Sequence, residues 1–472
     1  MFGLPAVSIT IFLPIISAFF IMITKKQDQQ NIKFVALWGS FFTFAIALFL
    51  LFEFDFNTPG ISNLNEFNWV YAHKIAYRVG LDKFSVFFIN LISLLSFLSI
   101  FWLFKKNIPK AKHFFMSLLI FESFSLGAFC ANDIFLLFVF MEASLIPLYV
   151  MLLCWDKEKN TEAILQLVIY TVVSAILILI AIIMIYTELQ TSNLSEIYKL
   201  GVKNESVFWL ILIGIAIKMP IWPFYHWLPN VHVKSPTVCS VLLASIVLKF
   251  STLLIVRFID PIFLKTLFHY KYFIFNFSIL SMLFATASLL FQDDLKRFFA
   301  YFSIIHMNMY LLILLSGTDK KYFIFSVIYH SIIMTILFFA ADIIKTMYKT
   351  RLISELRQLT THFTKIKHFM LFCIICLIGI PFSWGFVSEI LSIYSCSKIS
   401  IYYAYITGGV ILISSMYAFY VYNSAFGNSK TVNSSASDEF YISNIYKKTT
   451  LFALFFLIIL IGIIPGIILN RL

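Results

Sequence analysis

The chain has 472 residues, of which 61% are hydrophobic and only 12% are charged. Soluble globular proteins have about 45–50% apolar and about 25% charged residues, and they keep much of their surface in water. The composition therefore excludes a water-soluble fold. The net charge of +12 does not indicate nucleic-acid binding, because no Lys/Arg-rich block or basic amphipathic stretch carries it. Basic loops of a membrane protein account for it.

Apolar runs of about 20 residues, enough to cross a membrane as helices, recur along the whole chain. They predict spans at 4–23, 34–53, 84–104, 113–131, 134–154, 163–186, 207–226, 236–256, 272–291, 298–316, 322–344, 368–396, 402–423 and 450–469. The expected fold is an all-α polytopic membrane protein with about fourteen transmembrane helices. The first run is expected to remain as a span, and both termini to lie on one side.

The loops differ in their content of Lys and Arg. Loops that follow odd-numbered spans hold 21 of the 35 cationic residues, and loops that follow even-numbered spans hold 11. Because positive loops face the negative side of a membrane, we expect the odd loops in the matrix or cytoplasm and both termini opposite.

Seven ionisable residues lie near the middle of predicted spans, where a charge costs at least about 2.5–3.5 kcal/mol. They are Glu122, Glu142, Lys218, Lys249, His306, His330 and Glu389. Similar depth on separate helices predicts one layer of titratable groups near the midplane. Such a layer is a candidate path for ions.

Two of the charged spans contain prolines that interrupt a helix. Lys218 is followed by Pro220, and Glu389 follows Pro381 by eight residues. Broken helices at matching places in two halves of a transporter indicate its ion-binding sites. The prediction is two inverted five-helix repeats, 113–257 and 258–424, between an N-terminal three-helix region, 1–112, and a loop with the final helix, 425–472.

No motif for a soluble cofactor is present: neither GxGxxG after a strand nor a phosphate-binding P-loop occurs. Cys373 and Cys376 form a CxxC inside an apolar run, without a second pair or a His partner, which argues against a metal or redox site. Any hydride or electron transfer is expected on another chain.

Four segments carry recognisable motifs: FMEASLIPLY around Glu142, IKMPIWPFYHWLPNVHVKSPTVCSVLLASIVLKF from Ile217, DDLKRFFAYFSIIHMN around His306, and GFVSE around Glu389. A fifth segment, YRVGLDKFSVFF, leads into the third predicted span. Together they resemble the antiporter-like subunits of proton-pumping NADH:ubiquinone oxidoreductase, respiratory complex I. Among these, the chain is most similar to the chain 4 type, since chain 2 relatives carry Lys at the position of Glu389.

The resemblance implies roles for the buried groups. Glu142 and Lys218 would form the first acid–lysine pair, Lys249 a central relay, and Glu389 the terminal acid, with His306 and His330 along the connecting water path. Glu122 and His232 are additional relay candidates, and Glu122 rests on burial alone. The chain departs from the family at Tyr225, where relatives usually carry His, and at Ser331, where they usually carry Gly.

The same resemblance implies a core membrane-arm subunit that moves protons while NADH reduces ubiquinone on other subunits. No cofactor or metal is expected on this chain; NADH, FMN, iron–sulfur clusters and ubiquinone belong to the others. The expected partners are neighbouring antiporter-like and other membrane-arm subunits and lipids. Frequent Phe, Ile, Lys, Asn and Tyr, which have A/T-rich codons, favour the mitochondrial inner membrane over a bacterial plasma membrane.

Two alternative functions of the protein would also account for the buried charges. One is a subunit of a multisubunit monovalent-cation/proton antiporter, which shares this fold. The other is a passive scaffold whose buried charges only join helices, although such polar contacts average only about 0.6 kcal/mol in a membrane.

Overall fold

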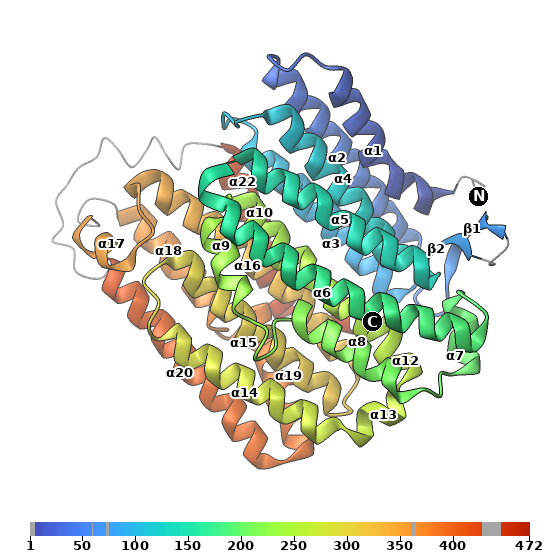
Figure 1. Ribbon diagram of the computed structural model, residues 1–472. Coiled ribbons are helices and arrows are strands. Elements are labelled where there is room, and N and C mark those ends of the chain that lie inside the picture. The colour runs from blue at the N-terminus through green and yellow to red at the C-terminus, as the bar shows by residue number, and fades with distance from the viewer. Residues whose placement is uncertain (1–4, 59, 72–74, 156, 360–363, 427–444) are drawn as a thin grey trace. The chain divides into compact units, whose positions relative to one another are not determined.

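A computed structural model describes residues 5–58, 60–71, 75–155, 157–359, 364–426 and 445–472 (Figure 1). The chain forms two compact units. The first unit is Met1–Lys218 with Ile246–Phe268 and Leu472, and the second is Met219–Ser245 with His269–Arg471. The division cuts the chain directly after Lys218 and again inside the helix that carries Lys249.

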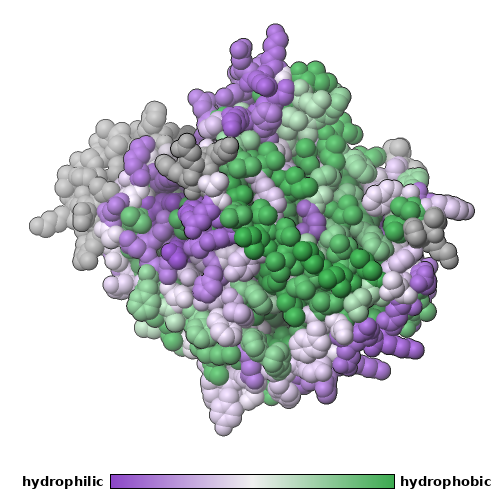
Figure 2. Space-filling view, viewed as in Figure 1, coloured by the Kyte–Doolittle hydropathy of each residue, from purple (hydrophilic) through white to green (hydrophobic). Residues whose placement is uncertain are grey.

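The first unit is built mainly from long apolar helices. They are α1 (Ala6–Ile23), α2 (Gln29–Glu53), α3 (Lys83–Leu103), α4 (Ala111–Cys130), α5 (Ile134–Trp155), α6 (Lys157–Leu189), α7 (Leu194–Leu200), α8 (Glu205–Lys218), α11 (Lys249–Leu254) and α12 (Asp260–Ile262). Within it α4 packs against α1, α3 and α5, and α8 packs against α6 and α11. Apolar side chains form a broad patch over α5 and α6 on the face seen in Figure 2, as expected of helices that face lipid.

The second unit surrounds two helices that are buried along most of their length, α15 (Leu295–Leu315) and α16 (Lys320–Tyr348). The others are α9 (Trp227–Lys234), α10 (Thr237–Leu242), α14 (Lys271–Leu289), α17 (Ile353–Leu359), α18 (Thr364–Leu377), α19 (Trp384–Ile399), α20 (Ile401–Phe426), α22 (Ile445–Ile463) and α23 (Gly466–Leu469). The short α13 (Leu264–His269) joins the two units along the chain. Both α15 and α16 contact α19.

Short polar residues fix where several helices begin. The Asp82 carboxylate accepts a hydrogen bond from the Ser85 amide at 2.8 Å ahead of α3, and Asp294 accepts from the Lys296 amide at 2.8 Å ahead of α15. Ser383 does the same for the Phe386 amide ahead of α19. Such caps satisfy amides that the first turn of a helix leaves free.

The chain is mainly helical, as expected, and a short β-hairpin lies between α2 and α3. The strands β1 (Ser62–Val70) and β2 (Ile75–Leu81) pair antiparallel, with Glu66 opposite Arg78. Aromatic and β-branched residues in both strands favour extended structure. The hairpin lies between the predicted spans 34–53 and 84–104, in a segment without a long apolar run.

Twelve helices among the described residues are long and apolar enough to cross a membrane. The remaining two predicted spans, 207–226 and 368–396, coincide with interrupted helices. In the span 207–226, helix α8 ends at Lys218, two residues before Pro220. The next helix along the chain is α9. The second is divided into α18 and α19 by residues 378–383, which contain Pro381.

Candidate functional site

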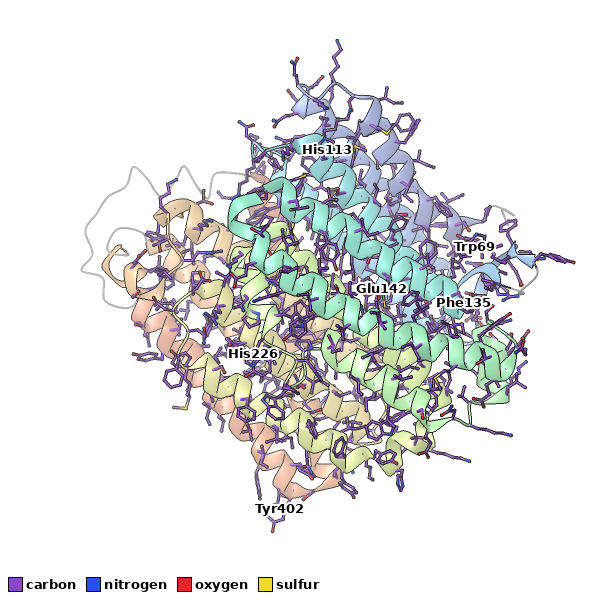
Figure 3. The ribbon with its side chains drawn as sticks, in the orientation of Figure 1. Trp69, His113, Phe135, Glu142, His226 and Tyr402 are labelled. Atoms are coloured by element: carbon purple, nitrogen blue, oxygen red, sulfur yellow. The ribbon has the colours of Figure 1, made fainter. Side chains whose placement is uncertain are left out.

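Glu142 and Lys218 form an ion pair inside the first unit. Lys218 is the last residue of α8, and its Nζ lies 3.0 Å from Oε1 of Glu142, which projects from the middle of α5 (Figure 3). The Lys218 side chain is 3% exposed and that of Glu142 is 19% exposed. The end of α8 adds to the pairing, because the C-terminus of a helix carries partial negative charge that favours a cation.

Lys249 lies in the same unit and is completely buried. It is the first residue of α11, between two π-helical turns, η2 (Leu243–Val247) and η3 (Ile255–Ile259). π-helical turns within α-helices occur frequently at functional sites. Because α11 packs against α8, the helices that carry Lys218 and Lys249 are neighbours in this unit.

Glu122 is the fourth of the predicted site residues that lie in the first unit. It lies on α4 and is fully buried, and neither of its carboxyl oxygens has a hydrogen-bond partner among the described residues. Burial of a lone carboxylate is costly, so this position needs a reason other than helix pairing. The geometry keeps Glu122 as a candidate proton carrier.

In the second unit, two histidines from adjacent helices face each other. The rings of His306 on α15 and His330 on α16 have centroids 6.0 Å apart and are nearly perpendicular. Both side chains are buried. Tyr310 and Tyr329 lie beside His306, with centroid distances of 5.8 and 6.4 Å.

Glu389 occupies α19, directly beyond the break in its span. It is buried, and its carboxyl group lies against Gly379, where an added Cβ would stand 2.7 Å from Oε2. Gly379 has a φ of +64°, a conformation that glycine adopts readily. The break thus places backbone without a side chain next to the acid.

His232, at the end of α9, is fully buried and stacks on Phe338 of α16 at 4.6 Å between ring centroids. Neither ring nitrogen has a hydrogen-bond partner within the described part of the chain. It belongs to the second unit, as do His306, His330 and Glu389. Glu122, Glu142, Lys218 and Lys249 belong to the first.

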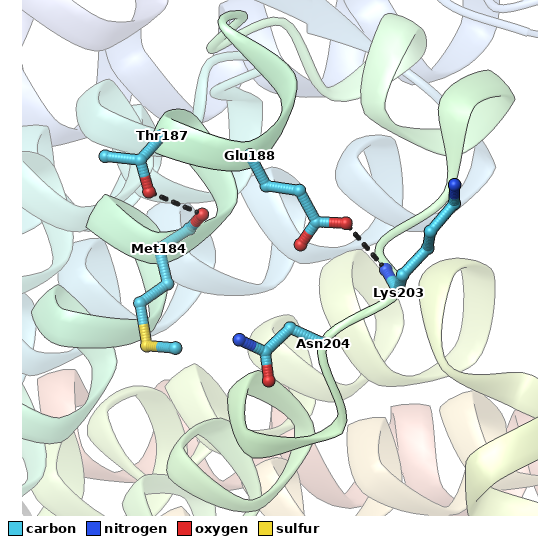
Figure 4. A pocket seen from close by; sticks show the side chains of 5 residues that line it. All are labelled: Met184, Thr187, Glu188, Lys203 and Asn204. Carbon is cyan, nitrogen blue, oxygen red and sulfur yellow. Dashed lines mark hydrogen bonds between the residues drawn. The ribbon is translucent and has the colours of Figure 1, made fainter.

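These groups do not line the pocket shown in Figure 4. A pocket of about 470 Å³ at the end of α6 is lined by Met184, Thr187, Glu188, Lys203 and Asn204 (Figure 4). There the Glu188 carboxylate accepts a hydrogen bond from the Lys203 amide at 2.9 Å. The buried groups, rather than this pocket, form the candidate site.

Tyr310, Tyr329 and Gly379 lie beside the predicted site residues but were not predicted from the sequence. A signal existed for the tyrosines, since Tyr310 follows His306 by one helical turn and Tyr329 precedes His330. Gly379 precedes Pro381 by two residues, but its closeness to Glu389 depends on how the chain bends at the break.

Comparison with known proteins places the chain in a family. Residues 131–416 match the family described as NADH:quinone oxidoreductase/Mrp antiporter, transmembrane. NADH-quinone oxidoreductase subunit M of Rickettsia prowazekii is 30% identical, over all of this chain and 97% of the relative. NADH-ubiquinone oxidoreductase chain 4 of Marchantia polymorpha is 25% identical, over 89% of this chain and 86% of the relative.

Solved structures show the same fold. A chain of respiratory complex I from Thermus thermophilus with bound NADH superposes with a TM-score of 0.85 at 21% identity, covering 98% of this chain and 97% of that one. A chain of the Mrp complex from Dietzia also gives 0.85, at 16% identity, covering 99% and 96%. This chain is a multi-pass membrane protein that belongs to the NADH:quinone oxidoreductase/Mrp antiporter family.

Proposed function

We propose that this chain is an antiporter-like membrane subunit of a NADH:quinone oxidoreductase, of the subunit M or chain 4 type, and that it translocates protons. The observation that carries the proposal is the Glu142–Lys218 ion pair at the end of interrupted helix α8. The full-length match to a subunit M relative supports the assignment to this enzyme.

The ion pair provides a switch that can hold or release a proton. Two unit charges about 4 Å apart interact by roughly 4 kcal/mol at an effective dielectric near 20. A small increase in their distance therefore lowers the proton affinity of the lysine substantially. Lysine suits this role because arginine keeps its proton under all physiological conditions. Displacing Glu142 would favour proton release from Lys218, and its return would favour recapture.

The proposed relay continues from Lys218 through Lys249 to His306, His330 and Glu389, with water between the groups. Glu122 and His232 are proposed as additional proton carriers beside this main path. Electron transfer from NADH to ubiquinone on other subunits drives the changes, so NADH, FMN, iron–sulfur clusters and ubiquinone are proposed to bind there. The partners are the other membrane-arm subunits, and the proposed location is the mitochondrial inner membrane, with a bacterial plasma membrane as the alternative.

Replacement of Lys218 tests the proposal. In the complete enzyme reconstituted into vesicles, Lys218→Ala should remove most NADH-driven proton pumping and slow the coupled turnover. Lys218→Arg should fail as well, because it preserves the charge but cannot release a proton. Pumping is measured with a pH-sensitive dye, and NADH oxidation is followed in parallel.

The matched control is Lys203→Ala, which removes an exposed lysine from the loop before α8. It should pump as the unmodified enzyme does. Normal pumping in Lys218→Arg would argue for a structural ion pair, and full pumping in Lys218→Ala would reject the role altogether.

A monovalent-cation/proton antiporter subunit is the second candidate, because the Mrp chain has an equally similar fold. The two functions differ in their partners. Purification through a tag on this chain should recover NADH oxidation that depends on quinone and stops with a quinone-site inhibitor. Recovery of sodium-dependent proton exchange without NADH oxidation would favour the antiporter instead.

A further inference from the structure

Tyr310 carries a buried hydroxyl group for which the described residues offer no hydrogen-bond partner. The residue is fully buried on α15. Burying a hydroxyl group without a partner is unfavourable, and phenylalanine would fill the same space without that penalty. Packing therefore explains the ring of Tyr310 but not its oxygen.

Tyr310 is close to titratable groups of three helices. It follows His306 by one turn of α15, with ring centroids 5.8 Å apart and planes inclined by 30°. His306 in turn lies 6.0 Å from the ring of His330 on α16. The helix that carries Tyr310, α15, also packs against α19, which carries Glu389. All four residues belong to the second unit, so these relations hold within one compact body.

The neighbouring Tyr329 differs in one respect. Its hydroxyl group donates a hydrogen bond of 2.8 Å to the backbone carbonyl of Cys376, in the helix before the break. That bond engages the proton of Tyr329 and gives its oxygen a structural role. The Tyr310 hydroxyl group makes no such bond to the described residues, so it is available to exchange protons.

We propose that the Tyr310 hydroxyl group carries protons between the His306–His330 pair and Glu389. The proposal rests on the proposed proton-translocating function and names a further member of that path. In one transfer, a protonated imidazole gives its N–H proton to the phenol oxygen as the phenol's own proton passes to the Glu389 carboxylate, directly or through water. One N–H bond becomes an O–H bond at tyrosine, the original tyrosine O–H bond becomes an O–H bond at Glu389, and the tyrosine ends neutral.

The test is Tyr310→Phe in the complete enzyme reconstituted into vesicles. NADH-driven pumping should fall by about tenfold or more, since positioned proton-transfer groups often contribute about a hundredfold or more. The thermal stability of the assembled enzyme should not fall, because the substitution removes only a hydroxyl group without a protein partner. The matched control is Tyr301→Phe, the same change at a buried tyrosine earlier on α15, which should pump normally.

Two results would overturn the proposal. Pumping of Tyr310→Phe at the level of Tyr301→Phe would show that the hydroxyl group is dispensable, and a parallel loss of stability and pumping would indicate a structural role. The variant Glu389→Gln distinguishes a failure of the role of Tyr310 from a failure of the proposed proton-translocating function. If Glu389→Gln abolishes pumping while Tyr310→Phe does not, only the role of Tyr310 fails; if Glu389→Gln pumps fully, the proposed path itself fails.

Discussion

Arg257 and Asp82 form a buried contact that motif analysis did not single out. The Arg257 guanidinium donates to the Asp82 carboxylate at 2.6 Å and to the Ser85 hydroxyl at 2.7 Å, all within the first unit. The Tyr198 hydroxyl donates to the backbone carbonyl of Arg257 at 3.1 Å. Since Arg257 follows Lys249 by eight residues on the same membrane-spanning stretch, the contact joins the helical stretch that carries Lys249 to the start of α3.

The charge of Asp82 depends on this partner. Burial by itself would raise the pKa of Asp82, but the positive charge of Arg257 and the hydrogen bonds from Arg257 and Ser85 outweigh it and lower the pKa below the usual range. A carboxyl group whose pKa is lowered by folding stabilises the folded state above its unfolded pKa of about 3.9. That stabilisation is lost as the pH falls through the lower, folded value.

Asp82→Asn should therefore destabilise the protein by about 2–3 kcal/mol at neutral pH, because it leaves the Arg257 charge without a counterion. The cost stays below that of a fully buried pair, since the Asp82 side chain is 26% exposed. Unfolding of the purified enzyme is the measurement. The difference from the unmodified enzyme should be constant between about pH 7 and 5 and shrink below about pH 4.

The control is Asp28→Asn, which changes another capping aspartate, ahead of α2, that accepts from the Asn31 amide at 3.1 Å. Asparagine caps helices about as well as aspartate, so this variant should be nearly neutral. Equal losses in Asp28→Asn and Asp82→Asn would contradict the importance of Arg257.

The break between α18 and α19 determines which backbone lies next to Glu389. Gly379 has a positive φ and lies against the Glu389 carboxyl group. Gly385 lies similarly close to Tyr329, where a Cβ would stand 2.5 Å from the hydroxyl oxygen. Both glycines permit close approach that a larger residue would prevent.

Gly379→Ala should reduce pumping and destabilise the chain by about 1–3 kcal/mol, because alanine would be strained at this φ and its Cβ would displace Glu389. Pumping and unfolding are measured on the same preparation. Gly408→Ala serves as the control, since a Cβ at this position of α20 meets nothing within 4 Å. It should be neutral or slightly stabilising, because alanine favours a helix over glycine by roughly 0.5–1 kcal/mol. A neutral Gly379→Ala would mean that the break adjusts freely.

Ser331 joins two elements of the second unit through a pair of hydrogen bonds. Its hydroxyl group donates to the backbone carbonyl of Ser245 at 3.0 Å, and the Ser245 hydroxyl donates to the carbonyl of Ser331 at 3.0 Å. Ser245 lies in the π-helical turn before Lys249. A serine beside His330 thus fastens α16 to that turn, which glycine could not do through a side chain.

Across the whole molecule, hydropathy was sufficient to locate the membrane helices, and charge inside the predicted spans identified Glu142 and Lys218 as candidates, because both signals come from residue type and spacing. The pairing of these two residues was expected from the family resemblance alone. The β-hairpin was missed because its alternating residues lie outside the apolar runs. The Arg257–Asp82 contact joins residues 175 positions apart, and whether the Tyr310 hydroxyl group finds a partner among the described residues depends on side-chain rotation. Sequence patterns carry neither kind of information.

The orientation of the whole chain is a prediction that the loop charges make and labelling can test. Asn57 lies in the segment after α2, and Asn107 lies in the lysine-rich loop before α4; both are exposed. The six native cysteines are buried, so a cysteine introduced at either position should react selectively. In sealed vesicles of known orientation, a membrane-impermeant maleimide should label Asn107→Cys only from the matrix or cytoplasmic side and Asn57→Cys only from the opposite side, because positive loops stay on the negative side. Labelling of both from one side would contradict the orientation, and labelling of both after solubilisation is the control for reactivity.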